Sequence, residues 1–149
     1  MRRILQSSAL ATMLLTSIVG LSACWTLRHE DVSVRPKYEN LIGRHYVLAQ
    51  PMNISGVNLP PGYGPTIDTY LIEPVDLNWS GPELITRDIL PAGTTLTVES
   101  IWRCTNCPFE DRLHALVAVD AFSGRSNVPI RVNLHDLVPP SIRVVEIPN

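Results

Sequence analysis

The chain has 149 residues, of which 12 are Lys or Arg and 14 are Asp or Glu, so its formal net charge at pH 7 is −2 with neutral histidines. This balance argues against a nucleic-acid partner, because binding to nucleic acid needs a basic stripe or patch. Thirteen prolines and eight glycines leave no room for long helices, and apolar segments rich in Val, Ile, Leu and Thr favour strands.

The N-terminal stretch has the outline of a secretory signal peptide, with Arg2 and Arg3 followed by an apolar run over residues 4–19. A membrane-spanning helix needs roughly 20 apolar residues. This run is shorter, is interrupted by polar residues and is closed by small ones. We therefore expect residues 1–23 to form a signal helix that is cleaved from the mature protein.

The tetrapeptide at the end of this stretch, Leu21-Ser22-Ala23-Cys24, resembles the lipobox of bacterial lipoproteins. The resemblance implies that Cys24 receives a diacylglyceryl group on its sulfur, becomes the new N-terminus and is acylated on its amine. Two or more acyl chains anchor a protein firmly, at about 0.8 kcal/mol per buried methylene. Trp25 replaces the Asp that retains many such lipoproteins in the inner membrane, so in a host with two membranes the resemblance implies the outer membrane, facing the periplasm. The alternative is an ordinary signal peptide whose cleavage site precedes a cysteine.

The mature part is long enough for one domain. Once residues 1–23 are removed, 126 residues remain with a net charge of about −4. That charge gives no reason to expect attraction to anionic lipid, so membrane attachment would rest on the acyl chains. Residues 24–40 are charged and lack apolar periodicity, and we interpret them as a flexible tether in which His29, Glu30 and Asp31 are solvated rather than metal-binding. Residues 41–149 would form a single β domain.

Strand signals begin just after this tether. Residues 44–50 (RHYVLAQ) alternate in polarity and predict the first strand, which Pro51 ends. Residues 52–65 are interrupted by prolines and glycines and predict a loop. Residues 67–73 (IDTYLIE) predict a second strand, whereas residues 84–90 fit either a strand or one helical turn.

The second half of the chain contains the longer strand signals. Residues 94–103 (TTLTVESIWR) predict a strand with a bulge at Ser100-Ile101, where the alternation changes phase. Residues 112–122 are apolar on both alternating sets except at His114 and Asp120, which suits a central strand that pairs with the preceding one.

Three short elements complete the prediction. Residues 128–134 alternate cleanly, with Arg131 and Asn133 on the outward set, and predict a strand. A short 3₁₀ turn is expected at residues 135–137 and a closing strand at residues 141–147. About six short strands, each ended by Pro or Gly, predict an all-β fold, either a small barrel or a sandwich.

Two features resemble bacterial SH3-like domains. The run at residues 90–98 (LPAGTTLTV) is similar to the "LPxGTxLxV" turn and strand of that family. His135-Asp136-Leu137 stands where such domains often place a 3₁₀ turn before the last strand. The resemblance implies an SH3-like barrel over residues 41–149.

The close cysteine pair, Cys104 and Cys107, predicts a disulfide in an exported protein. A redox pair of the thioredoxin kind would need a helix after the first cysteine, and Pro108 with no helix signal follows here. A zinc site completed by His114 and His135 is the other alternative, although the spacing that makes zinc signals strong is missing.

The sequence contains none of the local motifs of nucleophilic, phosphate-binding or zinc-dependent enzymes, and we expect neither catalysis, nor a cofactor, nor a metal ion. Aromatic side chains remain as candidates for a shallow glycan or peptide groove. Tyr46 and Trp102 lie inside predicted strands and are interpreted as core residues. Tyr63 and Trp79 lie in predicted loops and are the candidate ligand-binding residues.

These observations predict a lipid-anchored, non-enzymatic protein of the cell envelope that binds another envelope component, either a protein or peptidoglycan. The alternative is an inhibitor or immunity lipoprotein that neutralises an enzyme in the periplasm, with the loop over residues 58–65 plugging the active site.

Overall fold

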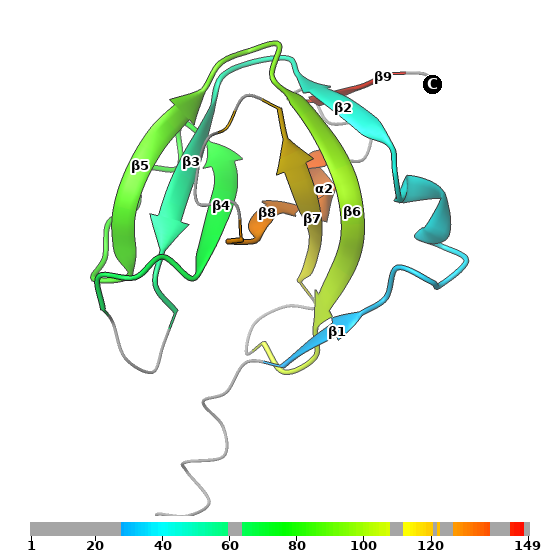
Figure 1. The fold of residues 1–149 in the computed structure, drawn as a ribbon, viewed down its shortest axis with the longest axis horizontal. Helices are drawn as coiled ribbons and strands as arrows, with labels where there is room; N and C mark the ends of the chain where they lie inside the picture. The colour runs from blue at the N-terminus through cyan, green and yellow to red at the C-terminus, as the bar shows by residue number, and fades with distance from the viewer. Residues whose placement is uncertain are drawn as a thin grey trace, which may run out of the picture.

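The computed structural model describes residues 28–59, 64–107, 112–120, 122, 127–137 and 144–147. The strands within these ranges form one sheet (Figure 1). Residues 1–23, the expected lipidation site Cys24 and the candidate ligand-binding residue Tyr63 lie outside the described residues. Within the described part, no helix has the length and apolar character needed to cross a membrane.

Nine strands form this sheet, and their bounds are β1 (His29–Asp31), β2 (His45–Leu48), β3 (Met52–Val57), β4 (Thr69–Pro74), β5 (Leu84–Leu90), β6 (Thr95–Cys104), β7 (Leu113–Val119), β8 (Ile130–Asn133) and β9 (Val144–Ile147). The strand order is β5-β3-β4-β8-β7-β6-β2-β9, with β1 paired to β6. The pair β4–β8 is parallel and the other pairs are antiparallel. Two short helices, the 3₁₀ helix η1 (Glu39–Leu41) and α2 (Leu134–Leu137), accompany the sheet.

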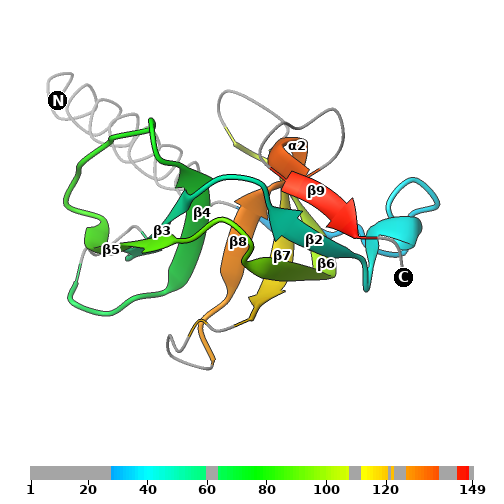
Figure 2. The ribbon, with the colours of Figure 1, turned by 90° about the horizontal axis from the view of Figure 1, so that it is seen from above.

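The all-β prediction is confirmed, but the sheet is larger than the six strands expected. Its ends are β5 and β9, which lie far apart when the molecule is seen from above (Figure 2). Because β5 and β9 are not paired, the described strands do not close into a barrel, which was one of the two architectures expected. The SH3-like identity stays a prediction.

The flexible tether expected at residues 24–40 is wrong for its described part, residues 28–40. Here β1 pairs with β6, with His29 opposite Cys104 and Asp31 opposite Trp102. The next residue, Val32, is fully buried in the core, and its N–H donates to the carbonyl oxygen of Ile101 at 2.9 Å. A charged three-residue strand with one apolar anchor is too short to show a period of its own, so the sequence pattern missed it.

The loop expected at residues 52–65 is also wrong over its first six residues. They form β3, which lies between β4 and β5 and is buried along its whole length. Gly56 does not break the strand. The space beside it is small, because a Cβ atom there would lie 2.8 Å from Cδ1 of Ile67. The same Cβ atom would lie 2.5 Å from Oγ1 of Thr86, so any larger residue would force these side chains to shift. In the sequence, this glycine resembles a turn residue.

Several other elements agree with the sequence prediction. Residues 84–90 form a strand, and the register of β6 against β7 shifts between Val98 and Ser100, as the expected bulge requires. Strand β7 lies inside the sheet between β6 and β8, and β9 closes the order against β2. The turn expected at residues 135–137 is instead the single α-helical turn α2.

The two faces of the sheet have different characters. One face packs on a hydrophobic core whose largest fully buried side chains include Tyr46, Leu48, Met52, Ile54, Ile72, Leu96 and Ile101. Because side chains alternate along a strand and paired residues share a face, the strand register also defines the opposite face. A row of paired residues crosses six strands on that face: Arg87, Ser55, Leu71, Arg131, Leu116 and Ser100. We call this side of the sheet the second face.

Candidate functional site

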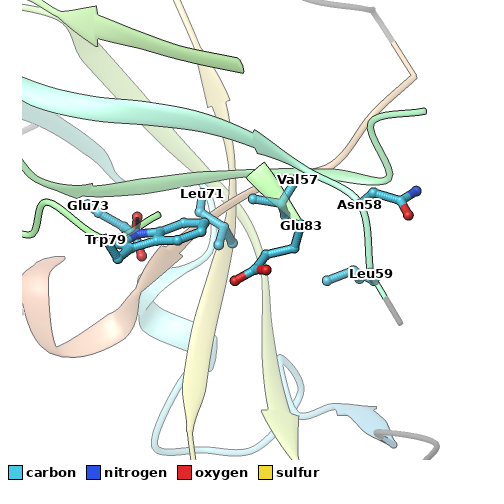
Figure 3. A pocket seen from close by; sticks show the side chains of 7 residues that line it. All are labelled: Val57, Asn58, Leu59, Leu71, Glu73, Trp79 and Glu83. Atoms are coloured by element: carbon cyan, nitrogen blue, oxygen red, sulfur yellow. Dashed lines mark hydrogen bonds between the residues drawn. The ribbon is translucent and has the colours of Figure 1, made fainter. Parts of the chain in front are cut away.

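A pocket of about 430 Å³ opens on the second face, at the end of the sheet formed by β3, β4 and β5 (Figure 3). Its lining residues are Val57, Asn58, Leu59, Leu71, Glu73, Trp79 and Glu83. In the close view, Leu71 lies between the indole of Trp79 and the carboxylate of Glu83. Trp79 comes from the connection between β4 and β5, so the sequence prediction that placed it in a loop is confirmed.

Trp79 is held by polar contacts on two sides. Its Nε1–H donates to Oε2 of Glu73 at 2.6 Å, and the guanidinium carbon of Arg87 lies 5.4 Å from its ring centroid. Arg87 also donates from Nη2 to the carbonyl oxygen of Trp79 at 2.6 Å and from Nη1 to Oδ1 of Asn78 at 3.0 Å. A half-buried indole fixed in this way presents a rigid aromatic wall to the pocket.

Asn58 fixes the rim of the pocket where β3 ends. Its side chain is buried, and its Nδ2 donates to the carbonyl oxygen of Thr66 at 2.8 Å and to Oδ2 of Asp68 at 2.9 Å. The backbone N–H of Gly64 donates to Oδ1 of Asn58 at 2.7 Å. The next residue, Leu59, is more than a third exposed and donates its N–H to the same Asp68 carboxylate. The rim is therefore held in place before any ligand arrives.

The chemistry of the pocket is acidic and apolar. Glu73 and Glu83 contribute carboxylates, Val57, Leu59 and Leu71 contribute aliphatic surface, and none of the lining residues is a cation. Carboxylates attract ammonium and guanidinium groups by charge, and one guanidinium, that of Arg87, already lies over the Trp79 ring. The pocket is therefore suited to a cationic group carried on an apolar stem.

The other aromatic residues divide between the core and the second face. Tyr46 is fully buried, as expected, and Tyr70 packs edge-on against Phe122 with ring centroids 5.0 Å apart. The interpretation of Trp102 as a core residue is wrong. Trp102 is half-buried opposite His114 on the second face, and its Nε1–H donates to Oγ of Ser100 at 2.9 Å. The bulge between Val98 and Ser100 changes the side on which the following residues of β6 point.

The cysteine pair forms a disulfide, with 2.05 Å between the sulfurs of Cys104 and Cys107. Both thiolates that the zinc alternative requires are therefore consumed by their mutual bond. Among the described residues, no group of three or more His, Cys, Asp and Glu is placed to hold a metal ion. The disulfide turn also holds β1, because the N–H of Thr105 donates to the carbonyl oxygen of Arg28 at 2.9 Å.

The sequence prediction found Trp79 but missed its partners. Glu73 precedes the tryptophan by six residues and Glu83 follows it by four, and nothing in that spacing reveals that both carboxylates line the same pocket as the ring. The usable signal was the occurrence of two acidic residues around an aromatic residue in a Pro- and Gly-rich connection.

In comparisons with known proteins, no family model, no curated protein and no solved structure matched the chain.

Proposed function

We propose that the protein is a lipid-anchored, non-enzymatic binding protein of the bacterial cell envelope, and that the Trp79 pocket receives a cationic side chain or amino group of a peptide. That peptide belongs to an envelope protein or to peptidoglycan. The anchor is the lipid on Cys24, inferred from the lipobox resemblance. The single observation that supports the ligand class is the pairing of two carboxylates with a fixed indole in a pocket whose lining contains no cation.

A physical reason supports this choice of ligand. Glu73 already accepts the indole N–H, so one of its oxygens is committed to holding Trp79. Glu83 contributes its backbone carbonyl oxygen to the N–H of Asn58 at 2.8 Å, and its side chain lines the pocket. An ammonium group between the two carboxylates would form charge-assisted hydrogen bonds, while its methylene stem would cover Leu71.

Site-specific photocrosslinking in living cells tests the pocket. A photoreactive amino acid at Leu59, on the exposed rim, should yield a discrete adduct, and the Glu83→Gln substitution should reduce that yield several-fold. The same amino acid at Val34, which is 86% exposed and does not line the pocket, is the matched control. Digestion of the adduct with a protease or with a peptidoglycan hydrolase distinguishes the two sources of the peptide. Equal yields from Leu59 and Val34, or no adduct at Leu59, would overturn the proposed ligand site.

The anchor has a separate test. The Cys24→Ser variant should move from the membrane fraction to the soluble fraction, and mass spectrometry of the mature wild-type protein should find acyl groups on its first residue. Retention of the serine variant in the membrane pellet would contradict lipid anchoring.

A further inference from the structure

A second group of polar side chains lies on the second face beside the Trp79 pocket. Arg131 stands on β8, between β4 and β7, and pairs with Leu71 on one side and with Leu116 on the other. Leu71 is itself a wall of the pocket, so the arginine is its immediate neighbour. The guanidinium is half-buried, and its Nε is buried without a hydrogen-bond partner in the described part of the chain. An arginine in the middle of a sheet that lacks an acceptor is incompletely satisfied.

Two histidines flank Arg131 on the same face. His114 lies on β7, two residues before Leu116, and pairs with Trp102 and Asn133. His29 lies on β1 opposite Cys104, two residues along β6 from Trp102. The three basic side chains act on one another electrostatically. Apolar surface from Leu71, Leu116 and Trp102 borders them, which strengthens charge interactions by keeping water away.

The charges that act on this group are all positive. Burial, followed by the charges of Arg131, His29 and Arg112, lowers the pKa of His114 to about 4. Burial and the charge of Arg131 also lower the pKa of His29.

The nearby acids have other partners. On the second face, Asp31 accepts two hydrogen bonds from Ser33, and Glu73 accepts the indole N–H of Trp79. On α2, which packs against β7, Asp136 lies 3.8 Å from His135. No carboxylate is among the charges that act on His114.

We infer that Arg131, His114 and His29 form a binding site for an oxyanion, a carboxylate or a phosphate group, directly beside the Trp79 pocket. The guanidinium would bind two oxygens through its planar fork. Each neutral imidazole can donate one N–H. The inference does not depend on the proposed function, because neither Arg131 nor the two histidines would hold the cation.

Anion binding at this site should strengthen as the pH falls. The histidines are neutral at pH 7, so Arg131 supplies the only full positive charge of the three at that pH. A bound oxyanion favours the imidazolium form and raises the pKa of both histidines. By linkage, protonation of the histidines then increases the affinity for the anion. The other charged groups near the cluster, Arg112, Asp31 and the pair His135–Asp136, do not change this sign.

The experiment is an NMR titration of the full-length lipidated protein in uncharged detergent micelles, followed through the imidazole resonances of His114. Phosphate and acetate are the two probes, and chloride at the same ionic strength is the control. We expect a saturable shift with at least one oxyanion, and for acetate, which stays largely ionised at both pH values, an apparent affinity at pH 5.5 at least threefold higher than at pH 7.5. The Arg131→Gln variant should bind at least tenfold more weakly.

Two further variants keep the test decisive. Arg35→Gln removes the same charge from an exposed arginine that pairs with Glu30, and it should leave the titration unchanged. Arg131→Lys keeps the charge but not the fork, and it should bind with intermediate affinity. This variant still tests the inference if the glutamine variant fails to fold. Shifts that do not saturate, that chloride reproduces, or that persist in both Arg131 variants would overturn the inference. None of these outcomes bears on crosslinking at Leu59.

Discussion

At the scale of single residues, Arg87 and Arg131 show two different uses of the same side chain in one row of the sheet. Arg87 is engaged by three acceptors, the Trp79 carbonyl and the side chains of Asn78 and Ser55, and by the ring of Trp79. Its role is to hold the wall of the pocket. Arg131, two strands away from Ser55 in the same row, has a buried donor without an acceptor among the described residues. The contrast separates an arginine that holds the pocket wall from one that is incompletely hydrogen-bonded.

The stability of the protein should depend on the protonation of His114. Its pKa is lowered from 6.5 to about 4 in the folded state, chiefly by burial, so between these values the unfolded chain binds more protons than the folded one. The contribution of His114 to the free energy of unfolding is therefore complete above pH 6.5, falls as the pH drops towards 4 and levels off below that. Because the imidazole keeps some exposure, we expect a loss of stability on the order of 2 kcal/mol. This is less than the free energy to which the whole pKa shift would correspond.

Urea unfolding at pH 7 and pH 4.5 measures this dependence. The wild type also contains carboxylates that titrate, so the quantity of interest is its difference from His114→Gln. That variant should lose less stability between the two pH values than the wild type. Equal losses in both proteins would show that His114 is not a buried neutral histidine. Saturating phosphate should reduce the pH dependence in the wild type alone, since a bound anion raises the pKa of the imidazole.

At the scale of elements, strand β1 connects the N-terminal segment to the sheet through one buried side chain. Val32 is fully buried, whereas Val34, two residues later, is 86% exposed. The Val32→Ala substitution should lower the free energy of unfolding by about 2 kcal/mol, because it removes buried methyl groups and leaves a cavity. Val34→Ala should change it by less than about 0.5 kcal/mol. Chemical denaturation of the two variants compares them, and equal effects would mean that β1 is not part of the folded domain.

The disulfide turn is the second element that holds β1. Replacing Cys104 and Cys107 with alanine should lower the free energy of unfolding by about 2 kcal/mol, a modest amount because the closed loop is short. The turn contacts Arg28 through the N–H of Thr105 and through Oδ1 of Asn106, which accepts the Arg28 N–H at 2.6 Å. Hydrogen exchange at residues 28–31 should therefore accelerate in the double variant, while exchange in β3 should stay slow. Unchanged exchange at residues 28–31 would contradict this coupling.

The sequence predicted best those elements whose pattern is local. The long strand β6, its bulge and its hairpin with β7 have clear alternation and a Pro-Ala-Gly turn before them. It failed at β3, where a glycine selected by close contact with Ile67 resembles a loop residue, and at β1, whose charges face solvent beside a single core residue. The sequence did not predict the proximity of Arg131 to the Trp79 pocket, for a related reason. Arg131 and Leu71 are 60 positions apart in sequence and become neighbours only through the parallel pair β4–β8, which no local pattern reveals.

At the scale of the whole molecule, the position of β1 sets how close the sheet would lie to a membrane. His29 begins β1 five residues after Cys24. A chain spans at most about 3.6 Å per residue, so an acylated Cys24 would keep this strand within about 18 Å of the point of attachment. A partner of this domain would therefore have to approach the membrane surface.

The two ends of strand β6 can be compared to test which end of the sheet lies nearer the membrane. Its ten residues extend about 33 Å, with β1 paired at the Cys104 end and the turn from β5 at the Thr95 end (Figure 1). In vesicles containing a lipid-borne quencher, a fluorescent amino acid at Thr105 should be quenched at least twofold more than one at Ala92, since both positions are exposed and lie at opposite ends of this strand. In the Cys24→Ser variant, which should not bind the vesicles, both labels should keep their full emission. Equal quenching at the two positions in the lipidated protein would mean that the sheet lies flat on the bilayer. The second face would then be a membrane contact rather than a ligand site.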